Sequence, residues 1–328
     1  MKICVKKGDG GFLDTKLVAG TTEGVIEEVS KAIVGKDEVL WKVLAAIFAN
    51  GHILLEDFPG LAKTLLARSL ATTLGCDFRR IQFTPDLLPS DITGGMVLNR
   101  KTNDFELRTG PLFTNLLLAD EINRAPPKTQ SALLEAMQER QITIDGDTHP
   151  LKPPFIAIAT QNPIEYQGTY PLPEAQLDRF LIRTAIGYPE KSDEIEILKS
   201  RRDRGKDDFD LKRVLDAEGL IAVQAEVEKV HVSDEMDVYI TEIVRSTRGH
   251  TYVEIGASPR GAIALMKMGM AMAAMSGRDF VVPDDVKEVS VAVLSHRLIL
   301  KPDPWLRGVK TEEVVQEVVN SIPVPKVK

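Results

Sequence analysis

The sequence predicts an α/β fold in which a parallel sheet carries helices on both faces and a small all-α domain follows. Between residues 22 and 188, helical patterns alternate with short apolar strands, as parallel strands joined by helical crossovers require. Beyond residue 189 the pattern indicates amphipathic helices and no convincing strand. We therefore expect a loose N-terminal arm over 1–21, an αβα domain over 22–188 and a helical domain over 189–328.

Composition excludes several classes of protein. The 328 residues are 43% hydrophobic, enough for a large core, and the net charge of −7 provides no overall basic field for nucleic acid. Cys4 and Cys76 are too few for a disulfide framework or a zinc site. Neither a signal-peptide pattern nor an apolar run of 18 residues is present, so we expect a cytoplasmic protein.

The first strand, near residues 53–56, leads through a Pro-Gly turn into a helix that opens on Lys63-Thr64. Backbone N–H groups at such a turn and helix start attract phosphate, the lysine adds positive charge, and the threonine hydroxyl can reach Mg²⁺. Asp57 and Ala62 stand where the strict pattern has glycine, and a purely structural Pro-Gly turn is the alternative. The candidate nucleotide-binding residues are Asp57, Phe58, Pro59, Gly60, Leu61, Ala62, Lys63, Thr64 and Leu65.

The next apolar run, residues 116–119, ends in two carboxylates, Asp120 and Glu121. A buried parallel strand that ends this way places acids at the sheet edge where ligands bind. Asp120 is the candidate Mg²⁺ ligand together with Thr64, and Glu121 is the candidate general base for an attacking water. An ordinary strand that ends in polar loop residues is the alternative.

Three further polar residues are candidates for catalysis. Asn162 follows the apolar strand 155–160 and could orient the attacking water. Arg179 follows the segment 173–178 and is a candidate arginine finger. Arg260 stands in the first turn of a helix that Ser258 would cap, where a cation is unfavourable for the helix dipole and so suggests an anion nearby.

These sites, in this order, resemble Walker A, Walker B, sensor 1, the arginine finger and sensor 2 of an AAA+ ATPase. The wording is similar to that of the MoxR family in Glu56-Asp57-Phe58-Pro59-Gly60-Leu61-Ala62-Lys63-Thr64, Ala119-Asp120-Glu121-Ile122-Asn123-Arg124-Ala125, Thr160-Gln161-Asn162-Pro163 and Pro173 to Phe180.

The resemblance implies a P-loop AAA+ core with a helical lid domain, ATP and Mg²⁺ as ligands, and a hexameric ring. Its implied work is chaperone-like remodelling or maturation of other proteins, often beside a von Willebrand factor A domain partner. Residues 85–110 would be the helix-2 insert and residues 141–150 a hairpin, both facing the pore of the ring. Arg179 would act in the neighbour's site, with Arg124 as a second candidate, and Arg260 would close the lid onto the γ-phosphate.

Two other functions stay open at this level: a nucleic-acid translocase, and a non-hydrolysing switch that scaffolds a partner. The charge run over 199–208 mixes both signs and is interpreted as a solvated face or linker without function. Met268, Met272 and Met275 recur at helical spacing, which indicates a core stripe or a partner groove.

Overall fold

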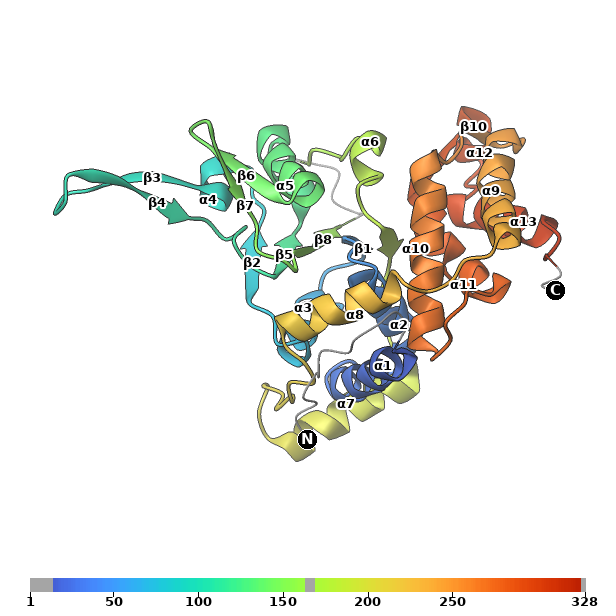
Figure 1. Ribbon diagram of the computed structural model, residues 1–328, viewed down its shortest axis with the longest axis horizontal. Coiled ribbons are helices and arrows are strands. Elements are labelled where there is room, and N and C mark those ends of the chain that lie inside the picture. The colour runs from blue at the N-terminus through green and yellow to red at the C-terminus, as the bar shows by residue number, and fades with distance from the viewer. Residues whose placement is uncertain (1–13, 163–168, 326–328) are drawn as a thin grey trace.

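A computed structural model describes residues 14–162 and 169–325 of the chain. Its centre is a five-stranded parallel sheet in the order β2-β5-β8-β1-β9, with helices on both faces (Figure 1). The strands are β1 (Ile53–Glu56), β2 (Phe78–Gln82), β5 (Leu116–Asp120), β8 (Ile156–Gln161) and β9 (Ile182–Thr184). The predicted α/β fold is confirmed.

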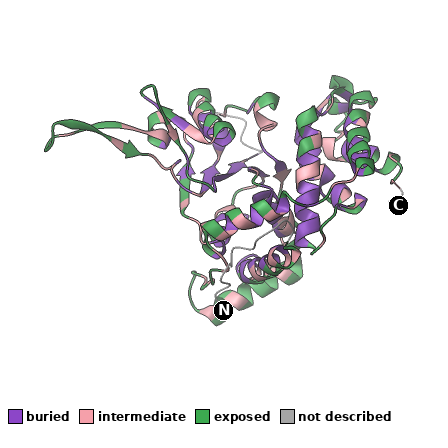
Figure 2. Ribbon diagram, in the orientation of Figure 1, coloured by how far each residue is buried: buried purple, intermediate pink, exposed green. Residues whose placement is uncertain are grey.

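Successive side chains of each strand point to opposite faces of the sheet, and helices cover both faces. Leu116 and Leu118 on β5 join the larger core cluster, on the side of α1 (Thr15–Ser30), α2 (Asp37–Phe48) and α3 (Lys63–Thr73). Leu117 and Ala119 join the second cluster, with α5 (Pro127–Glu139). The central strands β5, β8 and β1 are therefore apolar and buried, whereas β2 at the edge of the sheet is largely exposed (Figure 2).

Two antiparallel hairpins leave the sheet on the same side (Figure 1). The short helix α4 (Pro89–Thr93) leads into β3 (Gly94–Asn99) and β4 (Asp104–Thr109), which project far from the body and are largely exposed (Figure 2). The predicted second hairpin is confirmed as β6 (Gln141–Ile144) and β7 (Asp147–Pro150). Asp145 and Gly146 both have positive φ, as the tight turn requires.

The chain after residue 189 divides into two groups of helices. Helices α7 (Lys191–Arg204) and α8 (Ala217–Val227) lie beside α1, α2 and α3, on the domain that contains the parallel sheet (Figure 1). The others gather beyond β9 around α10. These are α9 (Asp234–Gly249), α10 (Pro259–Met275), α11 (Pro283–Leu294), α12 (Pro302–Leu306) and α13 (Thr311–Ser321).

Local details refine the sequence predictions. Residues 15–21, expected in a loose arm, form the first turns of α1, whose N-cap Asp14 accepts a hydrogen bond from the Leu17 amide. Met268, Met272 and Met275 are all buried, which confirms the core interpretation. The short helix expected within residues 173–180 is confirmed as α6 (Glu174–Leu177). The remaining short elements are η1 (Ile122–Arg124), η2 (Ser295–Arg297) and the paired strands β10 (Val253–Ile255) and β11 (Ile299–Leu300), too short to be read from the sequence.

Candidate functional site

The loop between β1 and α3 has the shape of a phosphate cradle. Gly60 and Ala62 both adopt positive φ, so the chain turns sharply before α3 begins at Lys63. The Lys63 ammonium donates to the carbonyl oxygens of Asp57 and Phe58 at 2.6 and 3.0 Å, which holds it over the loop. Burial lowers the pKa of Lys63, while Asp57, Asp120 and Glu121 raise it.

Asp57, predicted to bind nucleotide, has its carboxylate turned to backbone amides. One oxygen accepts from Phe58 at 3.0 Å and the other from Ile186 and Gly187 at 2.6 and 2.8 Å. The residue is buried, so these bonds satisfy a carboxylate that would otherwise be costly. Asp57 thereby connects the start of the P-loop to the segment that follows β9, so its side chain stabilises the conformation of the loop.

The Walker B aspartate is held by neighbours on both adjacent strands. Asp120 is buried, and its Oδ1 accepts from the Thr160 hydroxyl on β8 at 2.6 Å. Its Oδ2 accepts from the Arg80 guanidinium on β2, with the closer contact at 2.7 Å. The same Thr160 hydroxyl accepts from the Glu121 amide at 2.8 Å. Thr160 therefore fixes both acidic residues at the end of β5.

Glu121 adopts φ 55°, a conformation that turns it away from the line of the strand. Its Oε2 accepts from the Gln82 amide at 2.7 Å and from Arg124 at 2.9 Å. Both bonds go to one oxygen, so Oε1 is the atom that can accept from a water. Arg124, a candidate for acting on a neighbour, contacts the glutamate of its own chain here.

The parallel sheet brings the other predicted residues to the same edge. Asn162 is buried immediately after β8, which lies between β1 and β5. The hydroxyl of Thr64 and the carboxylate of Asp120 are oxygen donors of the kind that Mg²⁺ takes alongside phosphates and waters. The donor set therefore fits Mg²⁺, and Asp120 would bind the ion while Arg80 still donates to Oδ2.

Arg179 and Arg260 lie at the opposite edge of the sheet. Leu181 donates to the His52 carbonyl at the amino end of β1, so the segment containing Arg179 stands away from the P-loop, which follows the carboxyl end. Arg260 is 3.5 Å from the Asp178 carboxylate, next to Arg179. Arg260 therefore lies with Asp178, away from the P-loop of its own chain, and its contact with a γ-phosphate stays a prediction.

Both arginines line a hollow of about 260 Å³. It is strongly basic, with Asp178 as its acidic residue. Because like charges this close repel each other, such a hollow favours an anionic group supplied from outside. The basic residues that line it are Arg140, Arg179, Arg260, Lys267 and Arg297.

Arg297 organises that hollow, and the sequence analysis did not identify it. The guanidinium is almost fully buried and pairs with Asp178 at 2.7 Å. It also donates to the carbonyl oxygens of Phe180 and Leu181 at 2.7 and 3.2 Å. Burial lowers the pKa of Arg297, and Asp178 raises it. Arg297 therefore clamps the segment that presents Arg179.

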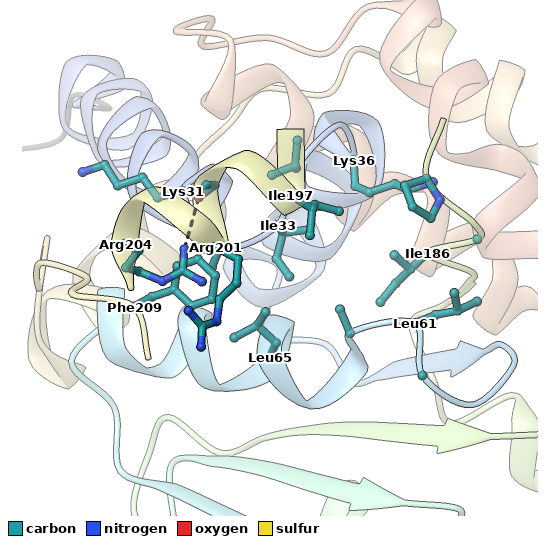
Figure 3. Close-up of a pocket in the computed structure, with 17 residues that line it drawn as sticks. Lys31, Ile33, Lys36, Leu61, Leu65, Ile186, Ile197, Arg201, Arg204 and Phe209 are labelled. Carbon is teal, nitrogen blue, oxygen red and sulfur yellow. Dashed lines mark hydrogen bonds between the residues drawn. The ribbon is translucent and has the colours of Figure 1, made fainter. Parts of the chain in front are cut away.

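A cavity of about 360 Å³ lies beside the P-loop (Figure 3). Its floor is the P-loop with Leu65 of α3, and one wall is the turn between α1 and α2. Helix α7 covers it with Ile197, Arg201 and Arg204. The charge run over 199–208 is largely exposed, as a solvated face should be, and Arg201 and Arg204 within it also line this cavity.

Comparisons with known proteins agree with this geometry. The profile of the ATPase family associated with various cellular activities matches residues 52–182, and the AAA lid domain matches residues 245–318. The uncharacterised protein YeaC of Bacillus subtilis is 49% identical over 92% of this chain and 93% of its own length. The chaperone MoxR1 of Mycobacterium tuberculosis is 41% identical over 94% and 83%, respectively.

The chain belongs to the MoxR family of AAA+ ATPases. The crystal structure of a candidate ATPase from Cytophaga hutchinsonii superposes with a TM-score of 0.88 at 41% identity, covering 95% of this chain and 97% of that one. As a MoxR-family protein it has an AAA core and an AAA lid. Across residues 14–162 and 169–325, every helix is too short or too polar to cross a membrane.

Proposed function

We propose that this MoxR-family protein hydrolyses ATP in a ring in which each subunit lends arginines to its neighbour. The observation that carries the proposal is the division of the charged residues between two edges of one sheet. Lys63, Asp120 and Glu121 lie at the carboxyl edge, whereas Arg179 and Arg260 lie at the amino edge. A head-to-tail arrangement of identical subunits joins one edge to the other.

In the proposed reaction, the P-loop amides and Lys63 hold the β- and γ-phosphates. Glu121 accepts the proton of the attacking water through Oε1, and Asn162 orients that water. Mg²⁺, held by Thr64 and Asp120, would supply positive charge to the phosphate oxygens. The basic hollow of the next subunit then completes the stabilisation of the transition-state charge, so turnover requires assembly.

We further propose that the hydrolysis drives chaperone-like remodelling of partner proteins. The relative from Mycobacterium tuberculosis bears the name chaperone. Support within this chain comes from the β3–β4 hairpin, where Met96, Val97, Leu98 and Phe105 are exposed far from the core. Exposed apolar side chains gathered on one projection favour contact with protein. A ring of six and a von Willebrand factor A domain partner belong to this proposal.

The first test measures Mg²⁺-ATP hydrolysis against protein concentration. Specific activity of the wild type should rise with concentration, because each site needs a neighbour. Lys63→Ala and Arg179→Ala should both lose at least about a hundredfold in turnover, the order of an essential charge in phosphoryl transfer. Arg307→Ala is the matched control, since that arginine is exposed and pairs with Asp303 in the helix just before it.

A flat concentration dependence with full activity of Arg179→Ala would contradict the shared site. Binding of ATP without turnover above the Lys63→Ala background would instead favour the non-hydrolysing switch. Turnover that requires DNA and falls steeply with salt would favour the translocase.

A further inference from the structure

Arg80 places a positive charge directly on the carboxylate that the proposed reaction assigns to Mg²⁺. Its Nε and Nη2 both donate to Oδ2 of Asp120, at 3.1 and 2.7 Å. Nη2 also donates to the side-chain oxygen of Gln82 at 2.7 Å, so the guanidinium is held at two points. Arg80 and Gln82 stand two positions apart on β2, where side chains share one face of the sheet.

These hydrogen bonds leave one position open on the Asp120 carboxylate. An ionised carboxylate has about four lone-pair positions, two on each oxygen. Arg80 takes both positions on Oδ2, and the Thr160 hydroxyl takes one on Oδ1 at 2.6 Å. The remaining position on Oδ1 is the one that a metal ion or a metal-bound water can use. Arg80 therefore keeps its contact with Oδ2 when Oδ1 accepts an ion.

The charge of this carboxylate is already balanced before any ion arrives. Arg80 pairs with Asp120, and Lys63 of the P-loop is close enough for an electrostatic interaction with the same residue. A divalent cation that approaches without nucleotide therefore meets two cations beside the carboxylate that it needs. Like charges repel strongly in a partly buried site, because water and salt screen them poorly there. The phosphates of a nucleotide reverse this balance, since they bring several negative charges.

Arg80 has two opposing effects on metal binding, and its charge has the larger one. A partner that orients a metal ligand raises the metal affinity of the site. Thr160 already orients Asp120, because its hydroxyl is fully buried and bonds Oδ1 directly. Orientation by Arg80 is therefore redundant, whereas its positive charge opposes the ion at every approach. Removal of that charge should make metal binding tighter.

On the basis of the Mg²⁺-ATP site proposed above, we propose that Arg80 makes metal binding depend on bound nucleotide. The arginine keeps the affinity of Asp120 for a divalent cation low, so that the ion binds only together with phosphates. The same weakening favours release of Mg²⁺-ADP after hydrolysis, because the product is held less tightly through the metal. Arg80 acts through Asp120, so it sets the strength of the metal site without taking part in the reaction.

Binding of Mn²⁺ in the absence of nucleotide tests Arg80 directly. Mn²⁺ takes the same oxygen ligands as Mg²⁺, and electron paramagnetic resonance separates the free from the bound ion. The Kd for Mn²⁺ should fall about tenfold or more in Arg80→Gln, which keeps a donor but removes the charge. Arg79→Gln is the matched control and should leave this Kd within about twofold, because Arg79 is exposed on the opposite face of β2.

Two further variants locate the effect. Arg80→Lys keeps the positive charge, so it should bind Mn²⁺ as weakly as the wild type. Arg80→Gln combined with Asp120→Asn removes the ligand, so it should abolish the gain in affinity. Urea unfolding verifies that each variant is folded, which is expected because the Arg80 side chain is 46% exposed on an edge strand.

Affinity for ADP provides a second readout, whose sign depends on the metal. In excess Mg²⁺, ADP should bind Arg80→Gln about tenfold or more tightly than the wild type, because Asp120 then holds the ion more firmly. With EDTA in place of Mg²⁺, ADP should bind no tighter, since a positive charge near the phosphates is lost. A purely structural role for Arg80 would weaken ADP binding under both conditions.

The outcomes separate this role of Arg80 from the ATP site itself. An unchanged or higher Kd for Mn²⁺ in Arg80→Gln, in a folded protein that still binds Mg²⁺-ADP, would overturn the role and leave the ATP site standing. A gain that persists after Asp120→Asn would also overturn it, because the ion would then bind elsewhere. A wild type that binds neither ADP nor ATP would overturn the proposed function first, and the role of Arg80 with it.

Discussion

At the scale of single residues, one hydroxyl connects the two acidic residues of the candidate site. Thr160 is fully buried, donates to Asp120 and accepts from the Glu121 amide. The φ of 55° at Glu121 is unfavourable for a residue with a Cβ, so the hydrogen bond to its amide helps to hold it. Thr160 therefore positions Glu121, the proposed general base, through the backbone of that residue.

Thr160→Val keeps the shape of the side chain and removes the hydroxyl. We expect the free energy of unfolding, measured with urea, to decrease by about 1–3 kcal/mol, because a buried carboxylate oxygen and an amide lose their partner. Turnover should fall more than ATP affinity, since the phosphate cradle is left intact. The control is Thr72→Val, on the exposed side of α3. A fall in affinity with unchanged turnover would contradict the positioning role.

His52 should make the fold sensitive to acid. The ring is buried, accepts from the Ala157 amide and contacts the Met137 carbonyl, and burial lowers its pKa to about 3. The unfolded chain therefore protonates this imidazole below about pH 6.5, whereas the folded chain does so only near pH 3. The free energy of unfolding therefore decreases as the pH is lowered through that window.

We expect protonation of His52 in the unfolded chain to lower the free energy of unfolding by about 2 kcal/mol from pH 7 to pH 5. His52→Gln keeps a donor and an acceptor but cannot ionise, so it should lose less stability than the wild type over the same range. Urea titrations at the two pH values measure the difference. Identical losses in both proteins would contradict this assignment.

At the scale of elements, the segment between α6 and β9 depends on η2. Arg297 is buried there, and pairs with Asp178 and two backbone carbonyls. Arg260 contacts the same Asp178, but its side chain is 52% exposed and the contact is 3.5 Å. The two arginines therefore form a matched pair in which burial is the difference.

Arg297→Met should destabilise the protein by about 3–5 kcal/mol, because Asp178 is left without its buried partner. Arg260→Ala should change the unfolding free energy by less than about 1 kcal/mol, as exposed pairs do. Thermal or urea unfolding measures both. Equal effects of the two variants would mean that Arg297 does not clamp the segment.

The sequence predicted those elements whose signals are local. The P-loop, the acidic end of β5 and the Asp145-Gly146 turn each occupy a few consecutive residues. The partners of the acids were not predictable in that way. Arg80 and Gln82 lie on β2, about forty positions before Asp120 and Glu121, and only the pairing of β2 with β5 brings them together.

The places of Arg260 and α7 depend on packing between domains. Ser258 capping and Pro259 at the start of α10 were readable, and the structure confirms both. Which end of the sheet α10 would meet was not, because that follows from its buried contacts with α2 and α11. Helix α7 carries no apolar face that would indicate where it lies.

At the scale of the whole molecule, the helical lid is linked to the P-loop through one arginine. Arg183 on β9 pairs with Glu56, the last residue of β1, at 3.2 Å, and with Glu312 of α13 at 2.6 Å. The P-loop begins directly after Glu56. Arg183 therefore joins the strand that leads into the P-loop to α13 of the lid.

The division of charges across the sheet predicts the behaviour of mixed rings. In the proposed ring, a Lys63→Ala subunit should not hold ATP productively but keeps Arg179 and Arg260. A double variant, Arg179→Ala with Arg260→Ala, keeps the P-loop and both acids but lends nothing to its neighbour. Each protein alone should be inactive. When the two are mixed, the P-loop of the double variant meets the arginines of the other subunit, and hydrolysis should return.

The recovered activity should depend on the ratio of the two proteins, because only one kind of contact in a mixed ring is complete. With random mixing at equal amounts, about a quarter of the contacts join a competent P-loop to intact arginines, so activity should approach that fraction of the wild type. The matched control replaces the Lys63→Ala protein with one that carries both Lys63→Ala and Glu121→Gln. Mixing that protein with the double variant should restore as much hydrolysis. Mixtures that stay inactive while forming rings would show that the arginines act within their own chain.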